Sequence, residues 1–125
     1  MPKKILVVDD SRTSQFLEQM ILRKGHYAVV TASDGEEGVS KALAEKPDLV
    51  LMDVVMPKMN GFEALRMLRC QPATQDTPVI MVTTRGESPH VELGFESGCN
   101  DYVTKPVQSA ELLSKVASCL HAAGA

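Results

Sequence analysis

The chain has 125 residues, of which 44% are hydrophobic, and this suffices for one domain with its own core. Its 13 basic and 16 acidic side chains are interspersed, and the net charge of −3 argues against direct nucleic-acid binding. No apolar run is long enough for a signal peptide or a membrane span, so we expect a cytoplasmic protein without membrane contact. The three cysteines have no metal-site spacing, which favours free thiols. We therefore expect a single domain over residues 1–125, with its core at about 4–120.

Short apolar runs alternate with amphipathic segments along the whole chain. The expected strands are the runs at residues 5–8, 28–31, 49–52, 79–82 and 102–104. Each is followed by helical spacing, with apolar faces formed by Phe16, Leu17, Met20 and Ile21, by Val39, Ala42 and Leu43, by Phe62, Leu65 and Leu68, by Val91, Leu93 and Phe95, and by Leu112, Leu113, Val116 and Leu120. The inner strands are continuously apolar, so both faces of the sheet should be covered by helices, which is typical of a parallel α/β sheet.

Cap and stop residues mark the ends of these helices. The first helix should end at Gly25, and the second should end before Pro47. Asn60, followed three residues later by Glu63, predicts a capping box at the start of the third helix. Ser109 should cap the last helix.

Polar side chains follow four of the expected strands. They are Asp9 and Asp10, Asp53, Thr83 and Thr84, and Lys105. In an open parallel sheet the carboxyl ends of the strands share one edge, where ligands bind. We therefore expect three carboxylates, a hydroxyl and an ammonium to converge at this edge.

Each of these residues alone has an ordinary structural explanation. Asp10 could cap the first helix, and Asp53 could form a structural ion pair with Lys105. The coincidence of all of them at one edge favours a functional site. Because three acids repel one another, a cation should neutralise them, and oxygen-only ligands suit Mg²⁺. A hard cation, a lysine and a hydroxyl are the groups that phosphoryl transfer needs.

Four segments resemble the receiver domains of bacterial two-component response regulators. They are residues 6–11 (LVVDDS), 52–57 (MDVVMP) with Asn60 and Gly61, 82–84 (VTT) and 101–106 (DYVTKP). The resemblance extends over residues 4–120 and is nearest to CheY-like single-domain regulators. It implies a doubly wound, flavodoxin-like (βα)5 fold with a five-stranded parallel sheet in the order 2-1-3-4-5. It also implies a signalling domain that catalyses only its own phosphorylation and dephosphorylation.

The resemblance assigns roles to the acidic residues. Asp53 matches the phosphoacceptor, while Asp9, Asp10, Asp53 and the backbone carbonyl of Val55 match the Mg²⁺ ligands. The implied phosphoryl donor is a cognate histidine kinase or phosphotransfer protein. An output protein would read the surface of the fourth helix, fifth strand and fifth helix, and the chain would be a monomer or weak dimer.

The remaining site residues match the phosphate-binding and switch positions of the family. Thr83 matches the family's switch residue, which carries a hydroxyl group, and Thr84 matches the position after it. Lys105 matches the phosphate-binding lysine. Tyr102 matches the switch aromatic. Pro106 matches a proline that usually follows a cis peptide bond.

Three positions depart from the commonest receiver pattern. Thr84 is larger than the alanine often found there, and Val55 cannot orient a water, so we expect slow dephosphorylation. Val107 stands where phenylalanine commonly helps to form the output face.

Two other functions compete with the phosphorylated switch. A receiver fold can act as a phosphorylation-independent interaction module, although such forms normally lack one of the acids, the threonine or the lysine. A Mg²⁺-dependent phosphatase of the aspartyl-phosphate class places its nucleophile after the first strand in an Asp-x-Asp pattern. Here that strand ends in Asp9 and Asp10, and the central acid follows the third strand.

Overall fold

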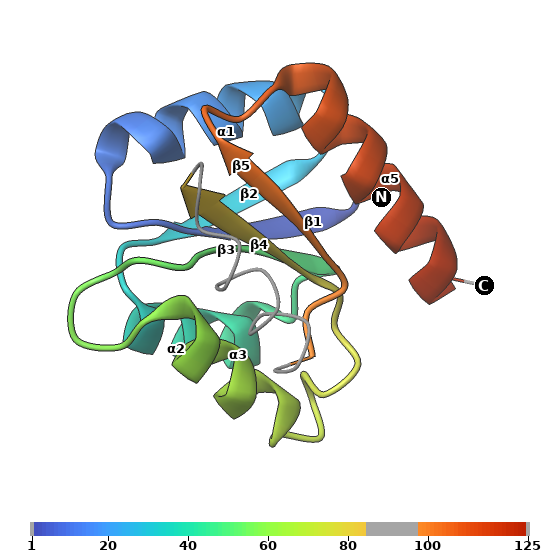
Figure 1. The fold of residues 1–125 in the computed structure, drawn as a ribbon. Coiled ribbons are helices and arrows are strands. Elements are labelled where there is room, and N and C mark those ends of the chain that lie inside the picture. The colour runs from blue at the N-terminus through green and yellow to red at the C-terminus, as the bar shows by residue number, and fades with distance from the viewer. Residues whose placement is uncertain (1, 85–97, 125) are drawn as a thin grey trace.

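The computed structural model describes residues 2–84 and 98–124. A twisted five-stranded parallel sheet forms the middle layer (Figure 1). Its strands are β1 (Lys4–Val8), β2 (Ala28–Ala32), β3 (Leu49–Asp53), β4 (Val79–Thr84) and β5 (Asp101–Lys105). Their order in the sheet is β2-β1-β3-β4-β5, with parallel pairing throughout. The predicted fold class and strand order are therefore confirmed.

Helices cover both faces of the sheet. Of the helices in the described part of the chain, α1 (Arg12–Lys24) and α5 (Ser109–Gly124) lie on one face, and α2 (Gly35–Glu45) and α3 (Gly61–Arg69) lie on the other (Figure 1). The helix expected from Val91, Leu93 and Phe95 lies outside the described residues. Among the described helices, none combines the length and the apolar character that crossing a bilayer requires.

The central strands explain why the chain contains unbroken apolar runs. In β1, Leu6 and Val8 pack into the cluster beneath α2 and α3, whereas Ile5 and Val7 pack into the cluster beneath α1 and α5. All five residues of β3 are buried as well. Successive side chains of a strand point to opposite faces, so a strand covered on both sides must be apolar at every position.

Most of the predicted helix ends agree with the structure. Asn60 and Glu63 form the capping box at α3: Glu63 N donates to Asn60 Oδ1 at 3.0 Å, and Asn60 N donates to Glu63 Oε1 at 3.3 Å. Gly25 is the C-cap of α1. The prediction for Ser109 was wrong by one residue, because Ser109 is already helical and the first turn of α5 starts from the carbonyl of Gln108.

The apolar face predicted for α1 was largely wrong. Phe16, Leu17 and Met20 are 65%, 42% and 45% exposed, and of the predicted set only Ile21 is buried. The side chains that α1 buries are those of Glu18, Ile21 and Leu22. The helix is therefore rotated so that an acid occupies part of its inner stripe. The predicted apolar face did not include Glu18.

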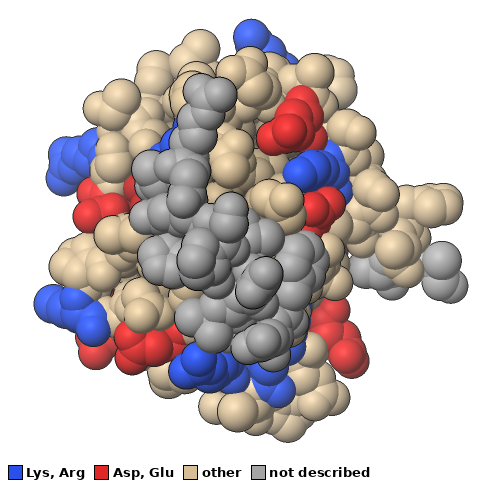
Figure 2. Space-filling model, in the orientation of Figure 1, with Lys and Arg blue, Asp and Glu red and all other residues tan. Residues whose placement is uncertain are grey.

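On the face visible in Figure 2, acidic and basic side chains alternate in small groups. This face carries no extended patch of one sign among the residues that are coloured, as expected from the mixed order of charges in the sequence.

Candidate functional site

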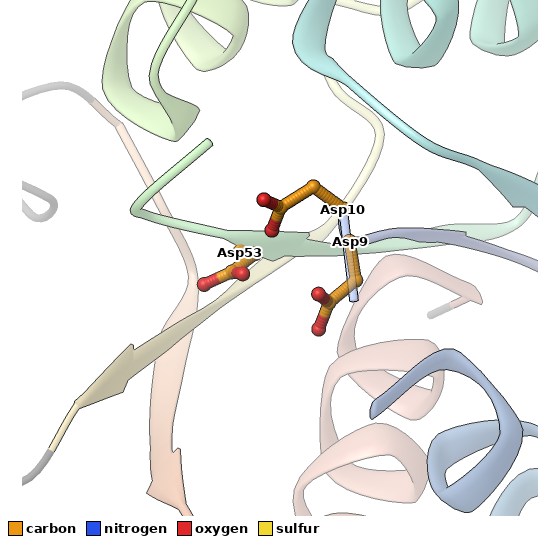
Figure 3. Close-up of side chains that lie close together, drawn as sticks. All are labelled: Asp9, Asp10 and Asp53. Atoms are coloured by element: carbon orange, nitrogen blue, oxygen red, sulfur yellow. The ribbon is translucent and has the colours of Figure 1, made fainter. Parts of the chain in front are cut away.

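Three carboxylates meet at the carboxyl edge of the sheet. Asp9 and Asp10 follow β1, and Asp53 is the last residue of β3 (Figure 3). One carboxylate oxygen from each residue lies within 4.8 Å of the others. Asp9 is fully buried, Asp53 is 5% exposed, and Asp10 faces solvent. Adjacent parallel strands β1 and β3 thus bring together acids that are more than forty residues apart in the sequence.

Lys105, at the end of β5, joins this cluster. Its Nζ lies 3.2 Å from Asp53 Oδ2, to which it donates a hydrogen bond, and 3.3 Å from Asp9 Oδ2. Burial alone would lower the pKa of Lys105, but Asp53 and Asp9 outweigh it and hold that pKa above its usual value. The ion pair that was the structural alternative for Asp53 is therefore present, and it also includes Asp9. One ammonium cannot neutralise three carboxylates.

The pKa of Asp53 is raised to about 6. Burial is the main cause, repulsion from Asp9 adds to it, and Lys105 opposes both. A second positive charge next to the carboxylates would favour the ionised form and lower this pKa. Ionisation of Asp53 and the presence of a cation beside it would therefore favour each other.

Local hydrogen bonds orient the first two acids. Ser11 is the N-cap of α1, since its Oγ accepts from Ser14 N at 3.2 Å, so Asp10 does not cap this helix. Ser11 N donates to Asp9 Oδ1 at 2.9 Å. Asp9 Oδ2 is buried and forms an ion pair with Lys105, and the carboxyl group of Glu18 also interacts with Asp9. A buried carboxylate beside two further acidic ligands suits a hard cation.

The loop after β3 brings Gly61 close to the backbone of Asp53 and Val54. Gly61 N donates to Val54 O at 2.9 Å, and a Cβ at Gly61 would lie 2.2 Å from the carbonyl oxygen of Asp53. Only glycine tolerates this approach. Val55 lies in the same loop and is 56% exposed.

The other predicted site residues lie on β4, β5 and the turn after β5. Thr83 is buried near the end of β4, and its Oγ1 donates to Val103 O at 3.5 Å. Thr84 is the last residue of β4 and pairs in register with Lys105. Tyr102 pairs in register with Met81, so the side chains of Tyr102 and Thr83 project from the same face of the sheet. The peptide bond between Lys105 and Pro106 is cis.

Glu18 is a residue at the site that the sequence interpretation missed. Its side chain is 1% exposed and interacts with the carboxylate of Asp9. Burial and then the nearby Asp9 raise the pKa of Glu18 to about 9, so this acid is neutral at pH 7. The signal available in the sequence was the spacing of Glu18. It lies one helical turn before Ile21 and Leu22 and therefore on the same side of the helix as these apolar residues.

Comparison with known proteins agrees with this geometry. The family model described as the response regulator receiver domain matches residues 5–117. Over 120 residues the chain is 44% identical to the alkaline phosphatase synthesis transcriptional regulatory protein PhoP of Bacillus subtilis, covering 96% of the chain and 49% of PhoP. It is 43% identical to Protein PilH of Pseudomonas aeruginosa, covering 90% of the chain and 93% of PilH. The chain thus spans about half the length of one of these relatives and nearly all of the other.

A solved receiver-domain structure shares this fold. The receiver domain of sensor histidine kinase PA1611 from Pseudomonas aeruginosa PAO1, which holds a magnesium ion coordinated in its active site cleft, superposes with a TM-score of 0.90 at 30% identity. The match covers 97% of this chain and 99% of that domain. With the parallel sheet, the acidic cluster and the lysine in place, the chain belongs to the family of response regulator receiver domains.

Proposed function

We propose that the chain is a phosphorylation-dependent signalling switch in which Asp53 accepts the phosphoryl group. The observation that carries this proposal is the grouping of the Asp9, Asp10 and Asp53 carboxylates within 4.8 Å, with the Lys105 ammonium 3.2 Å from Asp53. Membership of the receiver family supports it.

In this proposal the donor is a phosphohistidine on a histidine kinase or a phosphotransfer protein. An oxygen of the Asp53 carboxylate attacks phosphorus, the new O–P bond forms as the P–N bond breaks, and the imidazole leaves. Lys105 offsets the negative charge of the phosphoryl oxygens, and the Thr83 and Thr84 positions supply hydroxyl groups. The product is an acyl phosphate that water later hydrolyses at the same site.

Asp9, Asp10, Asp53 and the backbone carbonyl of Val55 are the proposed ligands of Mg²⁺. The set offers only oxygen atoms, and the carboxylates of Asp9, Asp10 and Asp53 each place one oxygen within 4.8 Å of the others. When bound, the ion offsets the repulsion between the carboxylate and the incoming phosphoryl group. The magnesium ion in the PA1611 receiver domain supports this choice of metal.

The output follows from Thr83 and Tyr102, whose side chains share one face of the sheet. Thr83 turns towards the new phosphoryl oxygens, and Tyr102 turns into the space that Thr83 leaves. This shifts an existing equilibrium between two states. It changes the surface of β5, α5 and the helix expected before β5, which a partner protein reads.

The test is the intact mass of the protein after incubation with Mg²⁺ and acetyl phosphate. We expect one phosphoryl adduct on the wild type and none on Asp53→Asn or in the presence of a chelator. An adduct that persists in Asp53→Asn would place the acceptor on another residue. A folded wild type with no adduct, even with a histidine kinase as donor, would contradict the switch and favour a phosphorylation-independent interaction module.

A further inference from the structure

Lys115 makes three contacts with the strand that carries Tyr102. Its Nζ, on α5, donates to the backbone carbonyl of Tyr102 at 2.6 Å and lies 3.6 Å from Asp101 Oδ1. The same Nζ lies 4.9 Å from the centroid of the Tyr102 ring, within range of a cation–π interaction. One ammonium therefore contacts the backbone, the neighbouring carboxylate and the aromatic ring.

The first of these contacts has a structural explanation. Because β5 is an edge strand, its outward-facing carbonyl groups have no strand to pair with, and a lysine there blocks unwanted strand pairing. Lys41 does the same at the opposite edge, where its Nζ donates to the carbonyl of Thr31 in β2 and lies 3.7 Å from Glu37 Oε2. Edge protection alone does not account for the position of the Lys115 ammonium over the ring.

The backbone contact makes the ring contact directional. Since the ammonium is held by the carbonyl of Tyr102 itself and by Asp101, its position is fixed relative to the Cα of Tyr102. Only ring orientations that face this position gain the cation–π attraction. Any orientation that turns the ring away from the ammonium loses it.

We propose that Lys115 is a positioning residue for Tyr102, and that it favours the ring orientation seen here over the others. The inference rests on the proposed function in one respect, the role of Tyr102 as the switch aromatic. In that role, Lys115 makes α5 part of the switch, because it biases the ring towards the orientation seen here in the absence of a phosphoryl group. A cation–π contact at a partly exposed site corresponds to a shift of about two- to fivefold in the ratio of the two orientations.

The experiment measures the χ1 rotamer populations of Tyr102 from three-bond NMR couplings in labelled protein, without acetyl phosphate. The variants are Lys115→Met, which keeps the alkyl packing, Lys115→Gln, which keeps a hydrogen-bond donor, and Lys115→Arg, which keeps a cation. Lys41→Met is the matched control, because it removes the lysine from the other edge strand. Thermal unfolding of each variant verifies that it is folded.

We expect Lys115→Met and Lys115→Gln to move the rotamer ratio about two- to fivefold away from the orientation seen here. Lys115→Arg should restore the ratio, and Lys41→Met should leave it unchanged. Wild-type rotamer populations in both Lys115→Met and Lys115→Gln would overturn the proposal, as would an equal change in Lys41→Met. Because no phosphoryl donor is present, this result is independent of the mass measurement on Asp53, and failure of one proposal is distinguishable from failure of the other.

Discussion

Glu18 is an acid on the buried stripe of α1, and its protonation is linked to folding. Burial and then Asp9 raise the pKa of Glu18 from 4.5 to about 9 in the folded protein. A carboxyl group with a raised pKa contributes its full stability below pH 4.5, and that contribution is lost as the pH rises towards 9. The loss is on the order of 1 kcal/mol for each pH unit in that window.

Replacing Glu18 with glutamine should remove this dependence on pH, because glutamine is neutral and resembles the protonated acid. We expect Glu18→Gln to match the wild type near pH 5 and to have a higher free energy of unfolding at pH 9, by at least ~2 kcal/mol. Urea unfolding at pH 5, 7 and 9 measures the difference, with the exposed Glu36→Gln on α2 as control. Parallel pH profiles for Glu18→Gln and the wild type would show that the buried acid is not protonated in the folded state.

The sequence allowed the charged residues at strand ends to be assigned to the site, but it did not reveal that Glu18 is buried beside them. Asp9, Asp53 and Lys105 interrupt or follow apolar runs, and parallel topology then brings such positions to one edge. Glu18 lies in a polar stretch of a helix, where sequence alone does not reveal which stripe faces the sheet. The contact of Lys115 with Tyr102 was equally hidden, because it depends on the path of α5 past an edge strand.

At the scale of elements, the strands and the capping box of α3 were easier to predict than the inner face of α1. Strands buried on both sides leave an unbroken apolar run, and a capping box depends on local residues alone. The inner face of α1 depends instead on tertiary packing, which left Phe16, Leu17 and Met20 exposed. Adjacent apolar residues such as Ile21 and Leu22 are compatible with more than one rotation of the helix.

The connection from β3 to α3 depends on the absence of a side chain at Gly61. In Gly61→Ala the new Cβ would lie 2.2 Å from the carbonyl oxygen of Asp53, so the backbone of Asp53 must shift. We expect a loss of about 1–3 kcal/mol in the free energy of unfolding and a clear weakening of Mg²⁺ binding. Urea unfolding and calorimetric titration with Mg²⁺ measure the two effects.

Gly25→Ala is the matched control for Gly61→Ala. There the Cβ would meet the end of the Leu113 side chain at 2.8 Å, which is flexible and lies away from the acidic cluster. This variant should lose stability without a change in Mg²⁺ affinity. If Gly61→Ala bound Mg²⁺ as tightly as the wild type, the close approach at Gly61 would serve packing alone and would not help to position Asp53.

At the scale of the whole molecule, Arg69 connects segments that are distant in the sequence. Its guanidinium donates to the carbonyl groups of Thr77 at 2.7 Å and Gly98 at 2.9 Å, and to Asn100 Oδ1 at 3.0 Å. Asn100 in turn pairs with β4, since its Oδ1 accepts from Val79 N at 2.9 Å. The end of α3, the start of β4 and the approach to β5 are thus held by one side chain.

Loss of this guanidinium should leave several carbonyl groups without their donor. We expect Arg69→Met to lower the free energy of unfolding by ~2–4 kcal/mol, and Arg69→Lys to recover only part of it, because an ammonium cannot reach all of these acceptors in the guanidinium's planar arrangement. Urea unfolding gives the values, with the exposed Arg66→Met on the same helix as control. Equal losses for Arg69→Met and Arg66→Met would mean that water satisfies these carbonyl groups. In that case packing of the sheet alone would hold the approach to β5, and with it Tyr102, in place.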